Sequence, residues 1–93
     1  MELRENIAKK RLYEGKTVSC FALWGYAGSD HIERLAPIKP HAIWMEGEHG
    51  NVDFADLPNQ TRACDIIGST PILRVNQNDQ GIIYRSLDLG AMG

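Results

Sequence analysis

Three short strand-like runs alternate with helix-like segments, and this rhythm constrains the fold more than any other feature of the chain. The runs are residues 17–24, 42–45 and 71–75, and helical patterns follow at about 29–36, 56–67 and 79–89. The middle run is apolar without alternation, which is typical of a parallel strand covered on both faces. Strands and helices in this order, joined by short connections, predict right-handed crossovers and an α/β fold with a parallel sheet.

Residues that start and stop helices support the three helical segments. Asp30 and Glu33 have the spacing of a capping box. Pro58 is tolerated only in the first turn of a helix, which predicts a late start for the second one. Asn78 or Asp79 caps the third helix. The expected stops are Pro37 and Pro40, then Gly68, then Gly90, and the first strand closes at Gly25 and Gly28.

An amphipathic leader helix is expected before the first strand. One apolar stripe runs through Leu3, Ile7, Ala8 and Leu12, with charged residues around it, and Gly15 follows as a stop signal. The expected order is therefore a leader helix and then three strand–helix units.

Composition narrows the class of protein. Ninety-three residues suffice for one small domain, and a net charge of −2 provides no basic surface for nucleic acid or an anionic membrane. No run approaches the roughly 20 apolar residues of a membrane span, and residues 1–5 are too charged for a signal peptide. Cys20 and Cys64 lack the spacing of a disulfide framework or zinc site, so we expect two reduced, buried thiols. These features favour a cytoplasmic protein with small-molecule or protein partners.

Ionisable residues follow the second strand at its carboxyl end. The apolar run changes abruptly to Glu46, Glu48 and His49, with Gly47 and Gly50 between and after them. In a parallel sheet, the loops that leave the carboxyl ends of the strands line one crevice, where ligands and catalytic groups collect. We therefore predict a functional site there. Two alternatives remain open. His49 could be a solvated loop residue, and Glu46 and Glu48 could point one inward and one outward instead of acting as an acid–base pair.

The neighbouring strands bring further residues to this edge, namely Trp24 and Tyr26 from the first and Arg74 from the third. Arg74 is a permanent cation in an apolar strand end, and such a charge needs a partner because its desolvation is unfavourable. The sequence leaves two possibilities open: a bound anion, or a salt bridge to Glu46, Glu48 or Asp79.

Asp88 lies near the end of the third helix, where the helix dipole disfavours an anion. A hydrogen bond that orients a histidine would compensate, and a solvated carboxylate is the alternative. The four lysines, by contrast, fall in the leader helix or before strands, so none is placed to form a Schiff base with a carbonyl. Carbonyl chemistry would need another electrophile, such as a metal.

Three blocks of the sequence together resemble the HpcH/HpaI aldolases of the aldolase/citrate lyase group. They are Glu46-Gly47-Glu48-His49, then Ile72-Leu73-Arg74-Val75 with Asn78-Asp79, then Leu87-Asp88-Leu89-Gly90-Ala91. The similarity runs ungapped from about Thr17 to Gly93. It implies a (β/α)8 barrel, usually in a hexamer, that uses a divalent metal such as Mg2+, Mn2+ or Co2+ to make or break carbon–carbon bonds of 2-oxo acids, with pyruvate and an aldehyde as partners.

The resemblance also implies roles for individual residues. His49 matches the histidine that acts as a base through a water, and Asp88 matches its carboxylate partner. Arg74 matches the arginine that holds the oxo oxygen and stabilises the enolate, and Trp24 and Glu46 would contact substrate. Two departures stand out. Glu46 occupies a position that is usually aspartate, and Leu23 occupies the position of a tryptophan that is here shifted to Trp24.

The resemblance implies that residues 1–93 are the amino-terminal portion of one incomplete barrel domain, because such a barrel takes about 250 residues. The leader helix and three of eight units would be present, a fourth strand would begin near Ala91-Met92-Gly93, and the metal ligands would lie downstream. The expected function is a metal-dependent carbon–carbon lyase, with the 93-residue piece inactive by itself. The alternative is a catalytically inert α/β fragment or a module that binds a partner.

Overall fold

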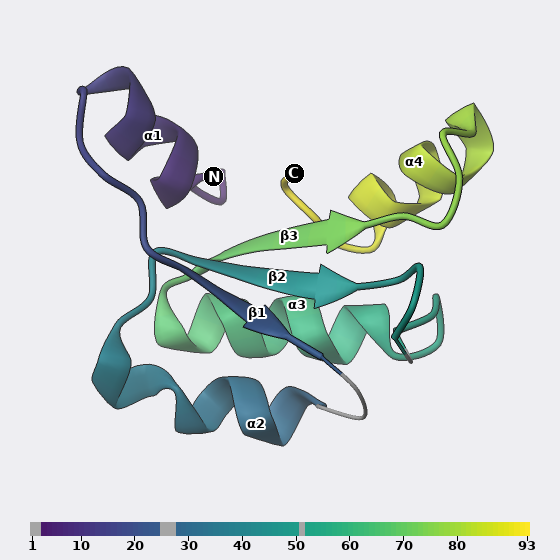
Figure 1. Cartoon of the computed structure of the whole chain (residues 1–93), viewed down its shortest axis with the longest axis horizontal. Coiled ribbons are helices and arrows are strands. Elements are labelled where there is room, and N and C mark those ends of the chain that lie inside the picture. The colour runs from purple at the N-terminus through teal and green to yellow at the C-terminus, as the bar shows by residue number, and fades with distance from the viewer. Residues whose placement is uncertain (1–2, 25–27, 51) are drawn as a thin grey trace.

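A three-stranded parallel sheet forms the centre of the molecule (Figure 1). The structure is a computed structural model that describes residues 3–24, 28–50 and 52–93, so the predicted positions of Gly25 and Tyr26 lie outside it. The strands are β1 (Cys20–Leu23), β2 (Ala42–Glu46) and β3 (Thr70–Arg74), in the order β1-β2-β3. Both pairings are parallel, which confirms the predicted α/β class.

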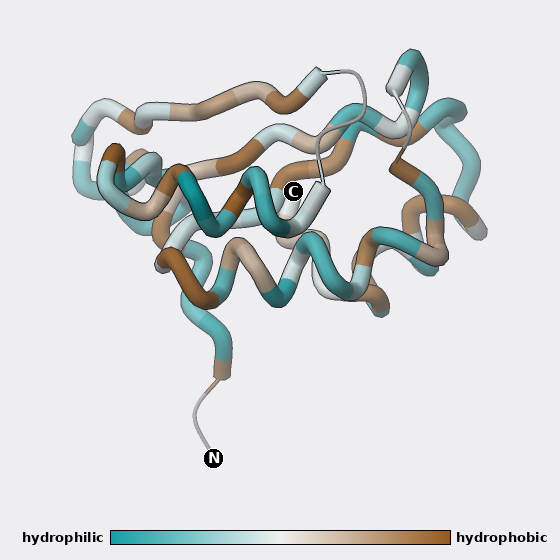
Figure 2. The backbone as a smooth tube through the Cα atoms, turned by 90° about the horizontal axis from the view of Figure 1, so that it is seen from below, coloured by the Kyte–Doolittle hydropathy of each residue, from teal (hydrophilic) through white to brown (hydrophobic). Residues whose placement is uncertain are grey.

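Helices α2 (Ser29–Arg34) and α3 (Leu57–Ile67) cover one face of the sheet (Figure 1). Figure 2 views these helices from outside, where hydrophilic and hydrophobic segments alternate along each of them. The core between helices and sheet consists of Leu23, Ile32, Ile43, Met45, Leu57, Ala63 and Cys64. Burial of this apolar surface is the main stabilising term for the layer.

Strand parity assigns the remaining side chains to the opposite face. Ile43 and Met45 belong to the core cluster, so the alternate residues of β2, Trp44 and Glu46, face away from α2 and α3. Glu46 pairs in register with Arg74, which therefore lies on the same face. The sheet thus separates a packed apolar side from a side that carries polar and aromatic groups.

Most predicted helix boundaries agree with the structure. Helix α3 begins after Asp56 with Pro58 in its first turn, and it ends at Gly68, whose φ is +73°. Helix α4 (Gln80–Asp88) is capped by the Asp79 carboxylate, which accepts the Ile82 N–H. The late start of the second predicted helix and the Asp79 cap are therefore confirmed.

The predicted capping box of the first helix after β1 is wrong. Gly28 occupies the N-cap of α2, and its N–H donates to Nδ1 of His31 at 3.1 Å. Asp30 instead lies inside the first turn, where its charge still interacts favourably with the helix dipole. The helix ends at Arg34, and Pro37 lies in a short 3-10 helix, η1 (Ala36–Ile38).

The leader helix is shorter and less buried than its apolar stripe predicted. Helix α1 (Ile7–Tyr13) starts after Asn6, so Leu3 lies outside it and is 85% exposed. Leu12 is exposed as well, and Ala8 is the buried residue of α1. The Ala8 N–H donates to Oγ1 of Thr70 at 3.0 Å, which holds α1 at the amino end of β3.

The chain after α4 returns to the free edge of β3. The Met92 N–H donates to the Pro71 carbonyl at 2.8 Å, and the Leu73 N–H donates to the Gly93 carbonyl at 2.9 Å. These bonds place residues 92–93 along the free edge of β3, and the start of a further strand near Ala91-Met92-Gly93 stays a prediction. Helix α4 lies beyond this edge (Figure 1), and Oγ1 of Thr61 in α3 donates to the Leu89 carbonyl at 2.9 Å.

The two cysteines are both free, but only one is buried as predicted. Cys64 lies in the core, and burial raises the pKa of its thiol to about 12, so it remains protonated. Cys20 is exposed on β1, contrary to the prediction, because β1 is an edge strand. Among the described residues, no helix is long and apolar enough to cross a membrane.

Replacement of Gly90 by alanine should destabilise the fold by about 2 to 4 kcal/mol. Gly90 has φ +110°, and a Cβ there would lie 2.5 Å from Oγ1 of Thr61, so backbone strain and a steric clash add together. Gly15→Ala is the matched control, because Gly15 also has positive φ but nothing lies within 4 Å of its Cβ position. Urea unfolding measures both losses, and equal losses would contradict the close approach of α3 and the end of α4.

Candidate active site

Glu46 is the centre of the polar cluster at the carboxyl end of β2. Its side chain is almost fully buried, with 1% of the residue exposed. Oε1 accepts hydrogen bonds from the backbone N–H of Glu48 at 2.7 Å, the backbone N–H of His49 at 3.2 Å and Nε of Arg74 at 3.0 Å. The carboxylate therefore shapes the loop after β2 as well as binding the neighbouring strand.

Arg74 reaches Glu46 from the paired position on β3. Nη2 of Arg74 forms an ion pair with Oε2 of Glu46, an oxygen that otherwise has no hydrogen bond within the described residues. Of the two possibilities that the sequence left open for Arg74, the structure thus shows the salt bridge. The pKa of Glu46 is lowered to about 2, and the hydrogen bond from Arg74 is the largest cause. This bond and the two backbone N–H donors outweigh burial, which raises the pKa of a carboxyl group. The same pairing raises the pKa of Arg74.

Glu48 connects Arg74 to His49. Its Oε1 lies 3.2 Å from Nε2 of His49, and its Oε2 lies 3.6 Å from Nε of Arg74. The Glu48 side chain is 39% exposed, whereas Glu46 is buried, so one carboxylate points inward and the other lies at the surface. The predicted gathering of His49 and Arg74 at one edge is therefore observed, through a shared carboxylate.

The loop that carries His49 folds back tightly over β2. A Cβ at Gly50 would lie 2.5 Å from the carbonyl oxygen of Glu46 and 3.0 Å from its Cβ, so only glycine fits there. The Gly47 N–H also donates to the Arg74 carbonyl at 2.9 Å, which extends the β2–β3 ladder into the loop. The glycines of this block thus hold the histidine above the strand ends.

Two tryptophans lie beside Arg74. Cζ of Arg74 is 5.8 Å from the ring centroid of Trp24 and 5.7 Å from that of Trp44, and the two centroids are 6.2 Å apart. These distances fit cation–π and aromatic pairing. The sequence predicted Trp24 here but missed Trp44, although its position two residues before Glu46 was the available signal.

Asp88 is not brought to His49 in this chain. It is the last residue of α4, it is exposed, and no hydrogen bond or ion pair involves it among the residues that the structure describes. It lines a shallow hollow together with Arg4, Pro58, Thr61, Arg62, Asp65, Leu89 and Gly90. The carboxylate that lies next to His49 is that of Glu48 instead.

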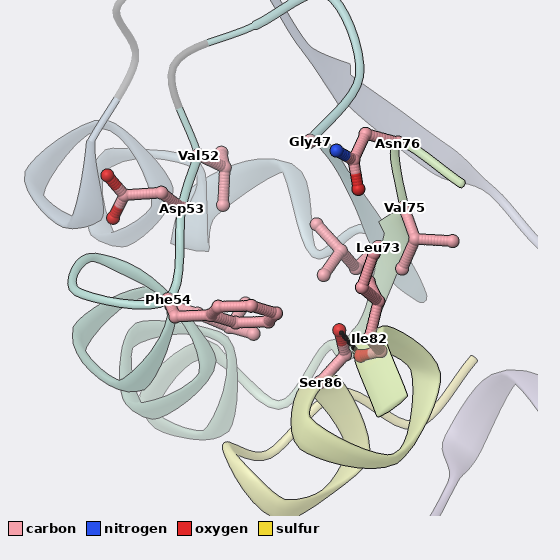
Figure 3. A pocket seen from close by; sticks show the side chains of 10 residues that line it. Gly47, Val52, Asp53, Phe54, Leu73, Val75, Asn76, Ile82 and Ser86 are labelled. Carbon is pink, nitrogen blue, oxygen red and sulfur yellow. Dashed lines mark hydrogen bonds between the residues drawn. The ribbon is translucent and has the colours of Figure 1, made fainter. Parts of the chain in front are cut away.

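Figure 3 shows the side chains that line an apolar hollow of about 150 Å³. Phe54, Leu73, Val75 and Ile82 line it where α3, β3 and α4 meet. Leu73 and Val75 alternate with Arg74, so the hollow opens away from the charged groups. We assign the candidate site to the Glu46–Arg74 cluster because the ionisable groups converge there.

The described residues do not form a metal site by themselves. No group of three or more His, Cys, Asp or Glu side chains lies close enough together in residues 3–24, 28–50 and 52–93. The Glu46 carboxylate is also neutralised by Arg74, so it is a poor ligand for a cation.

The Glu46–Arg74 pair should make stability depend on pH. Because the pKa of Glu46 is about 2 in the folded chain and near 4.5 when unfolded, its contribution is present above about pH 4.5 and is lost as the pH falls toward 2. The loss should be on the order of 1 to 3 kcal/mol. Urea unfolding of the wild type and of Glu46→Gln across this range measures it, and parallel pH profiles for the two proteins would contradict the assignment.

Comparisons with known proteins agree in pointing to aldolases, although no family model matches the chain. A hydroxypyruvate/pyruvate aldolase of Rhizorhabdus wittichii is 32% identical over 66 residues, which are 71% of this chain and 26% of the relative. A pyruvate aldolase of Rhizobium etli is 34% identical over 91 residues, 97% of this chain and 35% of the relative.

A solved structure is similar in fold as well. The crystal structure of an HpcH/HpaI aldolase from Desulfitobacterium hafniense matches with a TM-score of 0.80 and 25% identity, over 89% of this chain and 32% of that one. The chain therefore spans only about a quarter to a third of the length of these relatives. The fold similarity makes the three strand–helix units consistent with part of a (β/α)8 barrel. Over this portion, sequence and structure both support membership of the HpcH/HpaI aldolase family.

Proposed function

We propose that this chain is the amino-terminal portion of a metal-dependent aldolase. The enzyme would cleave 2-oxo acids to pyruvate and an aldehyde, or form them from these two compounds. The observation that carries the proposal is the convergence of Arg74, Glu48 and His49 at the carboxyl ends of β2 and β3. An anion-binding cation and a basic imidazole at one edge suit the abstraction of a proton next to a carbonyl. The aldolase names of the similar proteins support the same reaction class.

Arg74 is proposed to bind the oxo oxygen and to stabilise the enolate. Glu46 engages Nε and Nη2 of Arg74, whereas Nη1 makes no hydrogen bond within the described residues. Nη1 can therefore donate to a substrate oxygen while Glu46 keeps the side chain in place. Charge-assisted donors that are already oriented favour the developing negative charge without reorganisation.

His49 is proposed to act as the base through a water. Its side chain is 67% exposed, so water reaches the ring, while the Glu48 carboxylate lies beside Nε2 and orients it. Asp88 remains the partner that the family resemblance implies, although the chain shows it elsewhere. Glu48 and Asp88 are thus two candidates for the carboxylate that acts on His49.

A divalent metal is proposed as the cofactor of the complete enzyme, with its ligands downstream, as the family resemblance implies; the described residues include no group of three or more His, Cys, Asp or Glu side chains that could hold it. When bound, such an ion acts as a Lewis acid that polarises the carbonyl of the substrate. No lysine lies at the carboxyl ends of the strands among the described residues, because Lys16 and Lys39 precede β1 and β2, and Lys9 and Lys10 lie in α1. Schiff-base chemistry is therefore not proposed. Cytoplasmic location and a homo-hexamer are part of the same proposal.

Exchange of pyruvate methyl protons with deuterated water, catalysed by the full-length gene product, tests the roles of His49 and Arg74. We expect His49→Ala to slow the exchange by about 100-fold or more through loss of the base. Arg74→Ala should have an effect of similar size, and Arg74→Lys should recover part of the rate because it keeps the charge but not the paired geometry. Tyr84→Ala, at an exposed residue on α4, is the control. Unchanged exchange in both alanine variants would refute the assignment.

The two candidate partners of His49 can be separated by the rate of the same exchange. A carboxylate that orients the imidazole keeps its basic nitrogen in place, so removal of that carboxylate should slow the exchange about tenfold. We expect this loss in Glu48→Gln because Glu48 contacts His49. Asp88→Asn should slow the exchange only if Asp88 takes that role in the complete protein. Rates unchanged in both variants would exclude both carboxylates.

An inert module that binds a partner is the second candidate. It is favoured by exposed apolar side chains outside the core, among them Ile66, Tyr84 and Leu87. Analytical ultracentrifugation and metal analysis of the 93-residue chain distinguish the two. A monodisperse, folded and metal-free species would favour the module.

A further inference from the structure

We propose that Trp44, together with Trp24, is a positioning residue for Arg74: the two indoles restrict how the guanidinium presents Nη1 to a bound anion. This inference rests on the proposed function, because it concerns the orientation of the residue that would hold the 2-oxo acid.

The strand register places Trp44 below the ion pair. Trp44 lies between Ala22 of β1 and Ile72 of β3, one layer toward the amino ends from the Glu46–Arg74 pair. It faces away from α2 and α3, because Ile43 and Met45 on either side of it belong to the core. The indole therefore forms part of the surface on which the Arg74 side chain lies.

Contacts with two rings constrain the guanidinium beyond the constraint from Glu46. Glu46 holds the Nε and Nη2 edge, while the two ring centroids lie 5.7 and 5.8 Å from Cζ. The rings are tilted by 47° to each other, so they limit rotation of the group in two directions. Within the described residues, Nη1 is the guanidinium nitrogen that makes no hydrogen bond, so it can donate to a ligand.

Trp44 should contribute more than Trp24. Trp24 is 57% exposed, whereas Trp44 is partly buried on the middle strand. Cation–π attraction strengthens when the partners are shielded from water, because the charge is then less well solvated. The two tryptophans are therefore a matched pair, because their ring centroids lie 5.8 and 5.7 Å from Cζ while their burial differs.

Tryptophan fluorescence tests the contact without any assumption about activity. The chain has two tryptophans, so Trp24→Phe leaves Trp44 as its sole tryptophan, and excitation at the red edge of the absorption band selects it over the tyrosines. In this background, the double change Glu46→Gln with Arg74→Met removes both charges together, and we expect a clear change in Trp44 emission. Arg85→Met is the control, since that cation lies 4.3 Å from the ring of Phe54 instead.

Circular dichroism must show that each variant is folded. Arg74→Lys in the same background keeps a cation beside Glu46 but removes the planar guanidinium from the ring, so Trp44 emission should change there too, and this variant is used if the double variant does not fold. Emission that is unchanged in the folded variant used would overturn the proposal, whatever the protein catalyses.

Kinetics of the full-length gene product test the consequence. We expect Trp44→Leu to lower kcat/KM for pyruvate proton exchange about tenfold, Trp24→Leu to lower it less, and Trp44→Phe to stay within about threefold because it keeps an aromatic ring. In an Arg74→Lys background, Trp44→Leu should change the rate by less than about twofold, since the pair would already be uncoupled.

Equal losses in Trp44→Leu and Trp44→Phe, or the same loss in both backgrounds, would show a merely structural role and overturn the proposal. If the wild type shows no exchange at all, the proposed function is refuted, and the fluorescence test then decides separately whether Trp44 contacts Arg74.

Discussion

The buried ion pair between Glu46 and Arg74 is the interaction on which the candidate site depends. A carboxylate with 1% exposure is unfavourable unless its oxygens are paired, and here Oε1 accepts three hydrogen bonds while Oε2 faces the guanidinium. Two of these bonds come from the loop that carries Glu48 and His49. The pair therefore joins two strands and sets the course of the loop that carries Glu48 and His49 at the same time.

Side chains alternate between the two faces of the sheet, so the residues of the core and the residues of the candidate site lie on opposite faces. On β2, Ile43 and Met45 contact the helices, and Trp44 and Glu46 face the other way. A change at the polar face can therefore alter the site while the apolar core stays intact, provided that no buried charge is left without a partner. This division makes the variants of the site interpretable, because loss of function need not mean loss of the fold.

The sequence predicted the sheet and most helices because their signals are local. Pro58, Gly68 and Asp79 act within one helical turn, and the structure agrees with each. Features that depend on tertiary contacts could not be predicted from such local signals alone. The salt bridge of Arg74 requires the register that pairs it with Glu46, which a single sequence does not show.

The leader helix and the missed tryptophan have separate causes. Leu3 and Leu12 fit an apolar stripe, but in the described chain the buried residue of α1 is Ala8, and both leucines remain exposed. Trp44 was missed because an unbroken apolar run was interpreted as a strand covered on both faces, and such a run hides the alternation of its side chains.

The family resemblance implies a tryptophan at position 23 that is here shifted to position 24, and this shift illustrates how strand parity determines the face on which a side chain lies. Leu23 pairs with Met45 and belongs to the core on the helical side, whereas Trp24, one residue later, lies beside Arg74. Since a one-residue shift moves a side chain to the opposite face, a tryptophan placed at position 23 with this register would point into the core. Trp24 can contact the guanidinium because it follows the strand by one residue, and Trp44 completes the aromatic surface from the neighbouring strand. The aromatic contacts of Arg74 in this chain thus follow from the positions of two residues relative to the pleat of the sheet.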